Sequence, residues 1–165
     1  MTDYYQFYYE HTQKINELAQ MRDNITRDIR NCVIRTGTEL GYQTSGIAYH
    51  YRYWHISGTS DIYFTFLVPD AYTLQDNKKI HIILEVKQTM IEERKKFIND
   101  PVLQAIANES GASIGELHNG GSFMYLMIQT IELNAEVLTK LGERIAMENN
   151  TFILPVYKRV KQLIS

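Results

Sequence analysis

Three segments rich in β-branched and aromatic residues follow one another, and this succession constrains the fold most. The turn 57–60 separates the first two, and residues 69–79, which end in the polar, turn-like stretch 75–79, separate the second from the third. The segments are residues 47–56, 61–68 and 80–86. Such side chains favour strands, and strands joined by short turns pair as antiparallel neighbours. The third segment is apolar enough to lie at the centre of a sheet. The sequence therefore predicts a sheet that begins as three antiparallel strands.

Helical patterns flank these strands. Apolar residues recur at steps of three and four along residues 9–36, and Gly37 ends the pattern. This spacing is typical of a helix that packs on one side. The remaining expected elements are helices at 90–110, with a break near Pro101, and at 134–147, and strands at 122–131 and 152–157. The order α-βββ-α-β-α, with a further strand at the end, indicates an α/β or α+β protein.

Length and composition fit one domain over residues 1–165. With 44% hydrophobic residues the chain can build a substantial core. It has no apolar run of the ~20 residues that span a membrane, and its first residues lack the basic and apolar regions of a secretory signal. Cys32 is the only cysteine, which excludes disulfide frameworks and four-cysteine zinc sites. We therefore expect an intracellular, cytoplasmic protein with no membrane partner.

Charged residues lie at the end of the third predicted strand. Glu85 and Lys87 are two residues apart, so both side chains leave the same face while Val86 points into the core. A charged pair at the end of an apolar strand is costly if it is buried without a function. Asp61 begins the second strand, and a hairpin places the start of one arm beside the end of the other. We therefore expect Asp61 near Glu85 and Lys87, where two carboxylates and a lysine can bind a hard divalent cation and position a water molecule.

The order of these residues and elements resembles the PD-(D/E)xK nuclease superfamily, and is similar to RecB-like nucleases and to the N-terminal nuclease domains of type I restriction subunits. The similarity covers residues 10–130. The matching motifs are Glu39-Leu-Gly-Tyr after the first helix, Gly58-Thr-Ser-Asp61, Ile83-Leu-Glu85-Val-Lys87, Asp100-Pro-Val-Leu-Gln104 on a helix, and His118-Asn-Gly-Gly before a strand. The resemblance implies a restriction-endonuclease-like core, in which helices flank a central mixed sheet of four to five strands.

The resemblance also implies an activity. The chain would be a hydrolase, a magnesium-dependent endonuclease or exonuclease acting on DNA or RNA. Asp61, Glu85 and the backbone carbonyl of Val86 would hold Mg²⁺ or Mn²⁺, which neutralises charge on the scissile phosphate. Lys87 would orient the attacking water and stabilise the developing negative charge. In the related families a glutamine on the helix after the Glu-x-Lys strand lies beside the metal, and Gln104 matches it.

The sequence departs from the family pattern at two positions. The acidic metal ligand is often written Pro-Asp, yet Asp61 follows Ser60, while the literal Pro69-Asp70 comes nine residues later. We prefer Asp61 because it starts the longer strand after a glycine-containing turn, and Asp70 stays the alternative metal ligand. The glutamine motif often ends in tyrosine four residues on, where this chain has Asn108.

A second hypothesis comes from a different class of protein. The formal net charge is −2, whereas proteins that bind nucleic acid usually carry a basic surplus. A non-catalytic interaction module of the same fold fits this charge, whether an inhibitor or antidefence protein, an immunity protein or an assembly subunit. Its contact patch would be the aromatic cluster Tyr4, Tyr5, Phe7, Tyr8 and Tyr9. For the nuclease, we expect a homodimer or a larger protein complex to supply the grip on nucleic acid.

Overall fold

An antiparallel sheet forms the centre of the structure, which is a computed structural model and describes residues 2–46, 50–70, 73–74 and 76–165. The strands are β1 Thr44–Ser45, β2 Tyr51–His55, β3 Ile62–Leu67, β4 Lys79–Lys87, β5 Ser113–Asn119 and β6 Phe123–Glu132. The described residues place these six strands in the order β1-β2-β3-β4-β6-β5, and every neighbouring pair is antiparallel. The expected antiparallel succession of three strands is confirmed as β2, β3 and β4.

The sheet differs from the expected mixed sheet of four to five strands. The chain forms β5 before β6, and the two strands pair as a hairpin. β6 consequently returns antiparallel to β4, where a single strand after the helices would have run parallel to it. β5 gives little sequence signal, because its segment contains Gly115 and is mostly exposed, whereas predictable strands are rich in apolar β-branched residues.

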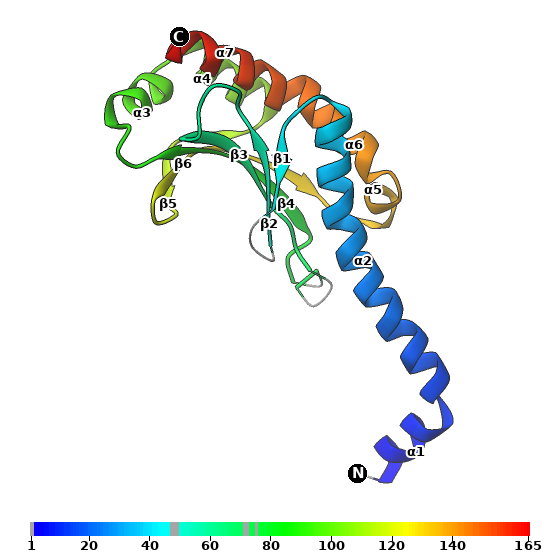
Figure 1. Ribbon diagram of the computed structural model, residues 1–165. Coiled ribbons are helices and arrows are strands. Elements are labelled where there is room, and N and C mark those ends of the chain that lie inside the picture. Colours follow the sequence, from blue (N-terminus) through cyan, green and yellow to red (C-terminus); the bar gives the residue numbers. More distant parts are fainter. Residues whose placement is uncertain (1, 47–49, 71–72, 75) are drawn as a thin grey trace.

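Helices cover one face of this sheet, so the protein belongs to the α+β class (Figure 1). They are α1 Thr2–Glu10, α2 Thr12–Glu39, α3 Ile91–Ile98, α4 Pro101–Ser110, α5 Ala135–Thr139, α6 Leu141–Glu148 and α7 Leu154–Ile164, with a π-helical turn at Asn149–Ile153. Buried side chains of α2, α4, α6 and α7 form one core with those of β2, β3, β4 and β6. The strands arch around the opposite face, and none of the described helices lies over it (Figure 1).

The contact between α2 and β2 fixes the long helix to the sheet. α2 continues through Gly37 to Glu39, so Gly37 does not end the helix but leaves room for the indole ring of Trp54. The indole N–H donates to the carbonyl oxygen of Val33 at 3.1 Å, and the ring of Tyr42 stacks on the indole with centroids 4.9 Å apart. Gly41, whose φ of 91° is left-handed, follows the end of the helix.

The C-terminal part of the chain is helical, and the strand expected at 152–157 is wrong. Phe152, Val156 and Val160 recur at steps of four and are fully buried, which is the spacing of a helical stripe. The helix expected at 134–147 is divided at Lys140 into α5 and α6. These helices and α7 complete the layer that covers the core face of the sheet.

An ion pair joins α7 to α4. The guanidinium of Arg159 donates to the carboxylate of Asp100 at 2.6 and 3.0 Å. Asp100 also caps α4 by accepting from the backbone N–H of Leu103 at 3.0 Å, which confirms the expected fresh helix start near Pro101. Arg159 holds the pKa of the Asp100 carboxyl below its ordinary value. This ion pair therefore holds together α4 and α7, which are far apart in the sequence.

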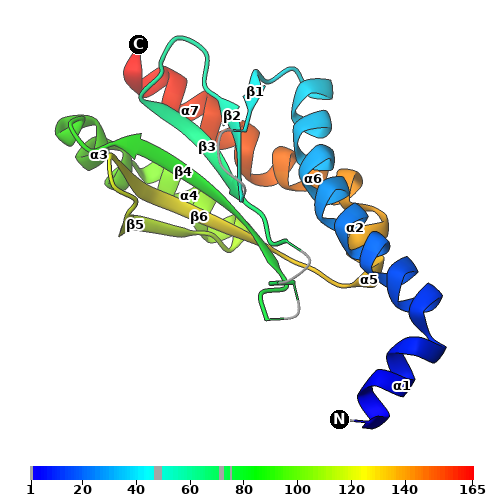
Figure 2. The same ribbon diagram turned by 60° about the horizontal axis from the view of Figure 1, so that its bottom comes forward.

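The N-terminal part of the chain projects from this body. α1 and the first half of α2 extend away from the sheet (Figure 2), and the buried residues of α2 begin only at Thr26. The exposed apolar side chains of this projection are Tyr4, Tyr5, Phe7, Tyr8, Tyr9, Leu18, Met21 and Ile25. Over the described part of the chain, no helix is both long enough and apolar enough to span a membrane.

Gly37→Ala is expected to destabilise the protein, although in a helix interior alanine is normally more stable than glycine by about 1 kcal/mol. A Cβ at this position would overlap the indole of Trp54 and meet Cγ2 of Thr44 at 2.8 Å. Overpacking of this kind costs about 1–3 kcal/mol, so the urea midpoint should fall. Gly142→Ala in α6 is the matched control, because a Cβ there meets Oγ1 of Thr36 at an ordinary 3.5 Å. Equal midpoints in the two variants would contradict the close approach of α2 to β2.

Candidate active site

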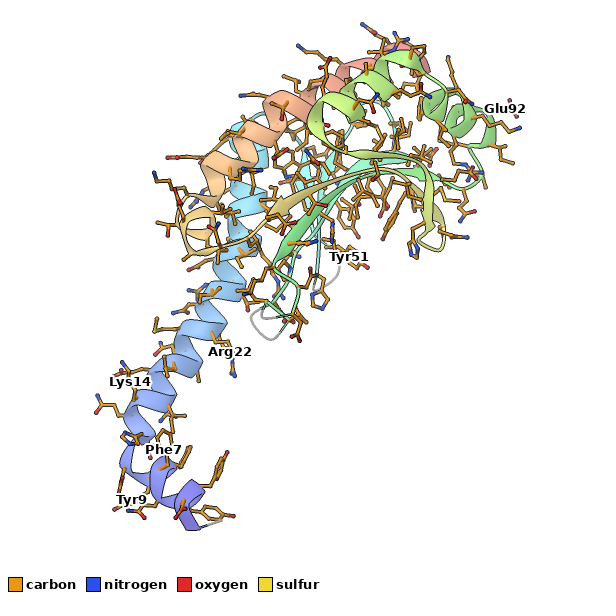
Figure 3. All side chains as sticks on the ribbon, turned by 180° about the vertical axis from the view of Figure 1, so that it is seen from behind. Phe7, Tyr9, Lys14, Arg22, Tyr51 and Glu92 are labelled. Carbon is orange, nitrogen blue, oxygen red and sulfur yellow. The ribbon has the colours of Figure 1, made fainter. Side chains whose placement is uncertain are left out.

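The uncovered face of the sheet carries a cluster of aromatic side chains. Tyr51, Tyr53 and His55 are alternate residues of β2 and share this face. The ring of Tyr63 on β3 lies 5.2 Å from that of Tyr53 and 4.9 Å from that of Phe123 on β6, measured between centroids. Figure 3 shows Tyr51 below the arch of the sheet, on the side away from the helices. The face therefore offers flat aromatic surfaces around its charged residues.

Asp61 and Lys87 contact each other directly at one end of this face. β3 and β4 pair Ile62 with Val86, so Asp61 lies across from Lys87, whose backbone N–H donates to the Asp61 carbonyl at 2.8 Å. The ammonium of Lys87 donates to Oδ1 of Asp61 at 3.1 Å. The side chains of Lys87 and Asp61 are 44% and 37% exposed. The ion pair thus lies at the rim of the sheet, where solvent and a ligand can reach it.

Glu85 lies on the same face, two residues further into the sheet. It is paired with Tyr63 of β3 and with Tyr125 of β6, and only 6% of it is exposed. Burial raises the pKa of the Glu85 carboxyl above its ordinary value, and a hydrogen bond with Tyr63 offsets part of this rise. Burial and the nearby Glu85 carboxylate together raise the pKa of Tyr125 to about 12. A buried acid with a shifted pKa beside an open surface is a candidate functional group.

The structure brings three of the residues singled out from the sequence onto one face. Asp61 and Glu85 are diagonal neighbours on paired strands, a relation in which Cα atoms lie roughly 7–8 Å apart. Lys87 lies directly opposite Asp61 and two residues from Glu85 on β4. A cation or a phosphate approaching the rim would meet Asp61 and Lys87 first, because only 6% of Glu85 is exposed.

Gln104 and Asp70 are not brought to this group. Gln104 is exposed on α4, and its side-chain amide donates to the carbonyl of Ile98 at 2.9 Å. Asp70 follows β3 at the end opposite Asp61, where its carboxylate accepts from the backbone N–H and the hydroxyl of Thr73 at 2.8 and 3.0 Å. Asp70 therefore stabilises a turn at the far end of the hairpin.

Asp61 and Glu85 are the carboxylates that this end of the sheet offers to a metal. Mg²⁺ keeps several waters and is commonly bound through one or two carboxylates together with substrate phosphates, so the donor set fits such an ion. Val86, whose carbonyl is the third expected ligand, is buried between Glu85 and Lys87 on β4. No cluster of three or more His, Cys, Asp or Glu side chains in the described ranges could hold a metal.

The tyrosines around Glu85 were not identified from the sequence as part of the site. Tyr51 and Tyr53 alternate with Arg52 and Trp54, and residues two apart in a strand share a face. Once Trp54 is assigned to the core, this alternation places both tyrosines on the opposite side. Tyr125 carries no comparable signal, because the register of β4 and β6 shifts between Leu84 and Glu85.

Comparison with known proteins gives no match: no protein-family model, no curated protein and no solved structure is significantly similar to the chain. The likeness of the motifs around Asp61 and Glu85 to nuclease motifs therefore stays a resemblance. The function has to be argued from the geometry of the open face.

Glu85→Gln is expected to change how stability depends on pH. Because the folded pKa of Glu85 is raised, the folded protein binds this proton more tightly than the unfolded chain does. The Glu85 contribution to the unfolding free energy is therefore full below the ordinary pKa of 4.5 and is lost as pH rises through the folded pKa. In urea denaturation, the free energy of unfolding of Glu85→Gln should therefore rise relative to that of the parent protein between pH 4 and pH 7.

The matched control is Glu109→Gln, which makes the same chemical change at an exposed position on α4. The difference in unfolding free energy between this control and the parent protein should stay nearly constant over this pH range. A constant difference for Glu85→Gln as well would contradict the burial of a titrating carboxyl on the open face.

Proposed function

We propose that the protein is a divalent-metal-dependent nuclease that hydrolyses phosphodiester bonds of DNA or RNA. The observation that carries this proposal is the placement of Asp61, Glu85 and Lys87 on one uncovered face at one end of β3 and β4. Two carboxylates and an ammonium group provide what metal-assisted hydrolysis of a phosphate ester needs. The resemblance of the surrounding motifs to the PD-(D/E)xK superfamily supports the same activity.

Each of these residues would have its own role in the reaction. Asp61 and Glu85, with the carbonyl of Val86, would hold Mg²⁺ or Mn²⁺. The bound ion supplies positive charge at the phosphate and a lowered pKa of a coordinated water. Lys87 now donates to Asp61. The ammonium of Lys87 would orient the attacking water and stabilise the negative charge that develops on the phosphate.

The burial of Glu85 makes this site sensitive to pH. A carboxyl must lose its proton to ligate a metal, so metal binding releases protons. Because burial raises the pKa of Glu85, cation binding and activity should both increase as pH rises through that raised value.

The tyrosines of the open face offer a surface for substrate. Tyr51, Tyr53 and Tyr125 lie around Glu85 on β2 and β6. Aromatic side chains bind single-stranded nucleic acid by stacking on its bases, largely without regard to sequence. Such contacts would supply part of the affinity that a chain of net charge −2 cannot draw from phosphate neutralisation.

The activity test is cleavage of DNA and RNA by the purified protein with Mg²⁺ or Mn²⁺, which a chelator should stop. Asp61→Asn, Glu85→Gln and Lys87→Met should each lower the cleavage rate by about 100-fold or more, the loss typical of removing a group that stabilises transition-state charge. Isothermal titration with Mn²⁺ should show binding to the parent protein and weaker binding to Asp61→Asn and Glu85→Gln. Undiminished cleavage by Glu85→Gln protein would mean that a contaminant is responsible.

Two further variants separate the site from its surroundings. Asp76→Asn neutralises an exposed carboxylate beyond β3 and should leave the rate unchanged. Asp70→Asn tests the alternative ligand, and it should affect stability through the turn with Thr73 rather than Mn²⁺ binding. Gln104→Ala should cleave like the parent protein if the glutamine keeps its contact with Ile98 in the active form.

A second candidate function, the non-catalytic interaction module, is favoured by the exposed aromatic side chains of α1. Tyr5 is 66% and Tyr9 85% exposed, and exposed aromatic clusters commonly mark protein contact sites. Deleting residues 1–9 should then abolish association with a partner protein while the body stays folded. Absence of cleavage together with this loss of binding would favour the module over the nuclease.

A further inference from the structure

The first half of α2 presents an apolar stripe to solvent. Ile15, Leu18 and Ile25 lie on one side of the helix at the spacing of a coiled-coil seam, and Arg22 occupies the remaining seam position. Leu18 is 53% and Ile25 39% exposed, and Met21 beside them is 56% exposed. We name this part of the chain, residues 2–25, the arm. A helix with such a stripe is stabilised mainly by packing it against another surface.

We propose that the arm pairs with the arm of a second copy of this chain, and that the two α2 helices run antiparallel. In the proposed register Ile15 of one copy packs against Ile25 of the other, and Leu18 packs against Arg22. A two-fold axis repeats both contacts, so one surface serves both copies. This pairing does not depend on the proposed nuclease activity.

The charges along α2 select the antiparallel direction. A parallel, in-register pair would place Arg22 against Arg22 of the second copy inside the seam, where like charges repel. In the antiparallel pair the stem of Arg22 lies along Leu18 and its charged head reaches solvent. Lys14 and Asp28 flank the seam, and both are exposed, with side chains 71% and 70% accessible.

The same charges select the register. With Ile15 opposite Ile25, Lys14 of each copy lies beside Asp28 of the other, which gives two matching ion pairs across the dimer. A shift by one heptad in one direction places Lys14 beside Arg35, a repulsive contact. A shift in the other direction places it beside the apolar Met21. Of these three antiparallel registers, only the proposed one places opposite charges side by side.

A groove at the base of the arm continues the stripe. It has a volume of ≈ 630 Å³ and lies between α2 and the α5–α6 segment, and the residues lining it on α2 include Ile25, Ile29 and Cys32. In the proposed register His11 of the second copy, where α1 meets α2, lies across from Ile29 at this groove. The aromatic side chains of α1, which are 48–85% exposed, would then begin near this groove. Figure 3 shows Phe7 and Tyr9 at the far end of the arm that makes this contact.

Disulfide cross-linking tests the direction and register. Cys32→Ser leaves a chain without cysteine, into which Ile15→Cys and Ile25→Cys are introduced in separate proteins. An oxidised mixture of the two should form a covalent dimer, because paired layers bring Cα atoms within the ~4.4–6.8 Å that a disulfide spans. Each protein oxidised alone should stay uncross-linked. A covalent dimer from either protein alone would indicate parallel helices and overturn the proposal.

Sedimentation velocity over a concentration series tests the charge pairs. Lys14→Glu and Asp28→Lys should each weaken the dimer by about tenfold, since two exposed ion pairs become repulsive contacts, and the double variant should restore the parent affinity. Lys158→Glu is the control, with the same charge change on an exposed residue of α7. Circular dichroism checks that each variant keeps its helices. A parent chain that stays monomeric throughout, or a double variant that is not restored, would overturn the proposal.

The outcome is separable from the nuclease test. Glu85→Gln protein should dimerise like the parent protein, because Glu85 lies on the open face of the sheet and not on the arm. A dimer without cleavage would refute the proposed activity alone. Cleavage by a strictly monomeric protein would refute the pairing alone.

Discussion

The seating of the Trp54 indole against α2 decides which face of the sheet the helices cover. Gly37 has no side chain to keep the indole away, and the bond from the indole N–H to Val33 satisfies its only polar atom within the core. Because neighbouring residues of a strand point to opposite faces, a buried Trp54 obliges Tyr53 to face outward. The same alternation along β3 and β4 directs Phe64 and Leu84 to the core and Tyr63 and Glu85 to the open side. The aromatic, charged face is therefore a consequence of how the core is built.

Glu85 is the group on this face whose position works against stability. Burial disfavours its charged form, and an apolar residue of similar size would avoid that cost. The ion pair of Asp61 and Lys87 gives little in return, because exposed pairs contribute only about 0–1 kcal/mol. Sequences that break a local rule usually do so at functional sites. The energetic argument for a site at Glu85 is thus independent of the motif resemblance, and both point to Glu85.

The features predictable from the sequence are those that local periodicity and short turns determine. The hairpin of β3 and β4 is one of them, because two antiparallel strands in succession place the start of one, at Asp61, beside the end of the other, at Lys87. The sequence places Gln104 on a helix correctly. The side of the helix on which Gln104 lies, however, depends on the burial of Leu103 and Ala107. The segment 152–157 has the composition of a strand, and its helix is held by the bond between Asp100 and Arg159, residues 59 positions apart. That contact leaves no local pattern, whereas the steps of four between Phe152, Val156 and Val160 are a helical pattern that extends beyond residue 157.

The arm and the candidate site lie at opposite ends of the body, and this separation lets one chain carry both. The turn before Asp61 is held at the C-terminal end of α7, where the ammonium of Lys161 donates to the carbonyl of Ser57 at 2.6 Å. Figure 1 shows that end of the sheet far from the point where α2 leaves the body. Pairing through the arms would consequently leave the Asp61–Lys87 rim of each copy open to a ligand. If the proposed nuclease pairs in this way, two open faces would be available, and two weak contacts on one nucleic acid strand would bind far more tightly than either would alone. The near-neutral charge of one chain is therefore compatible with a nucleic acid substrate.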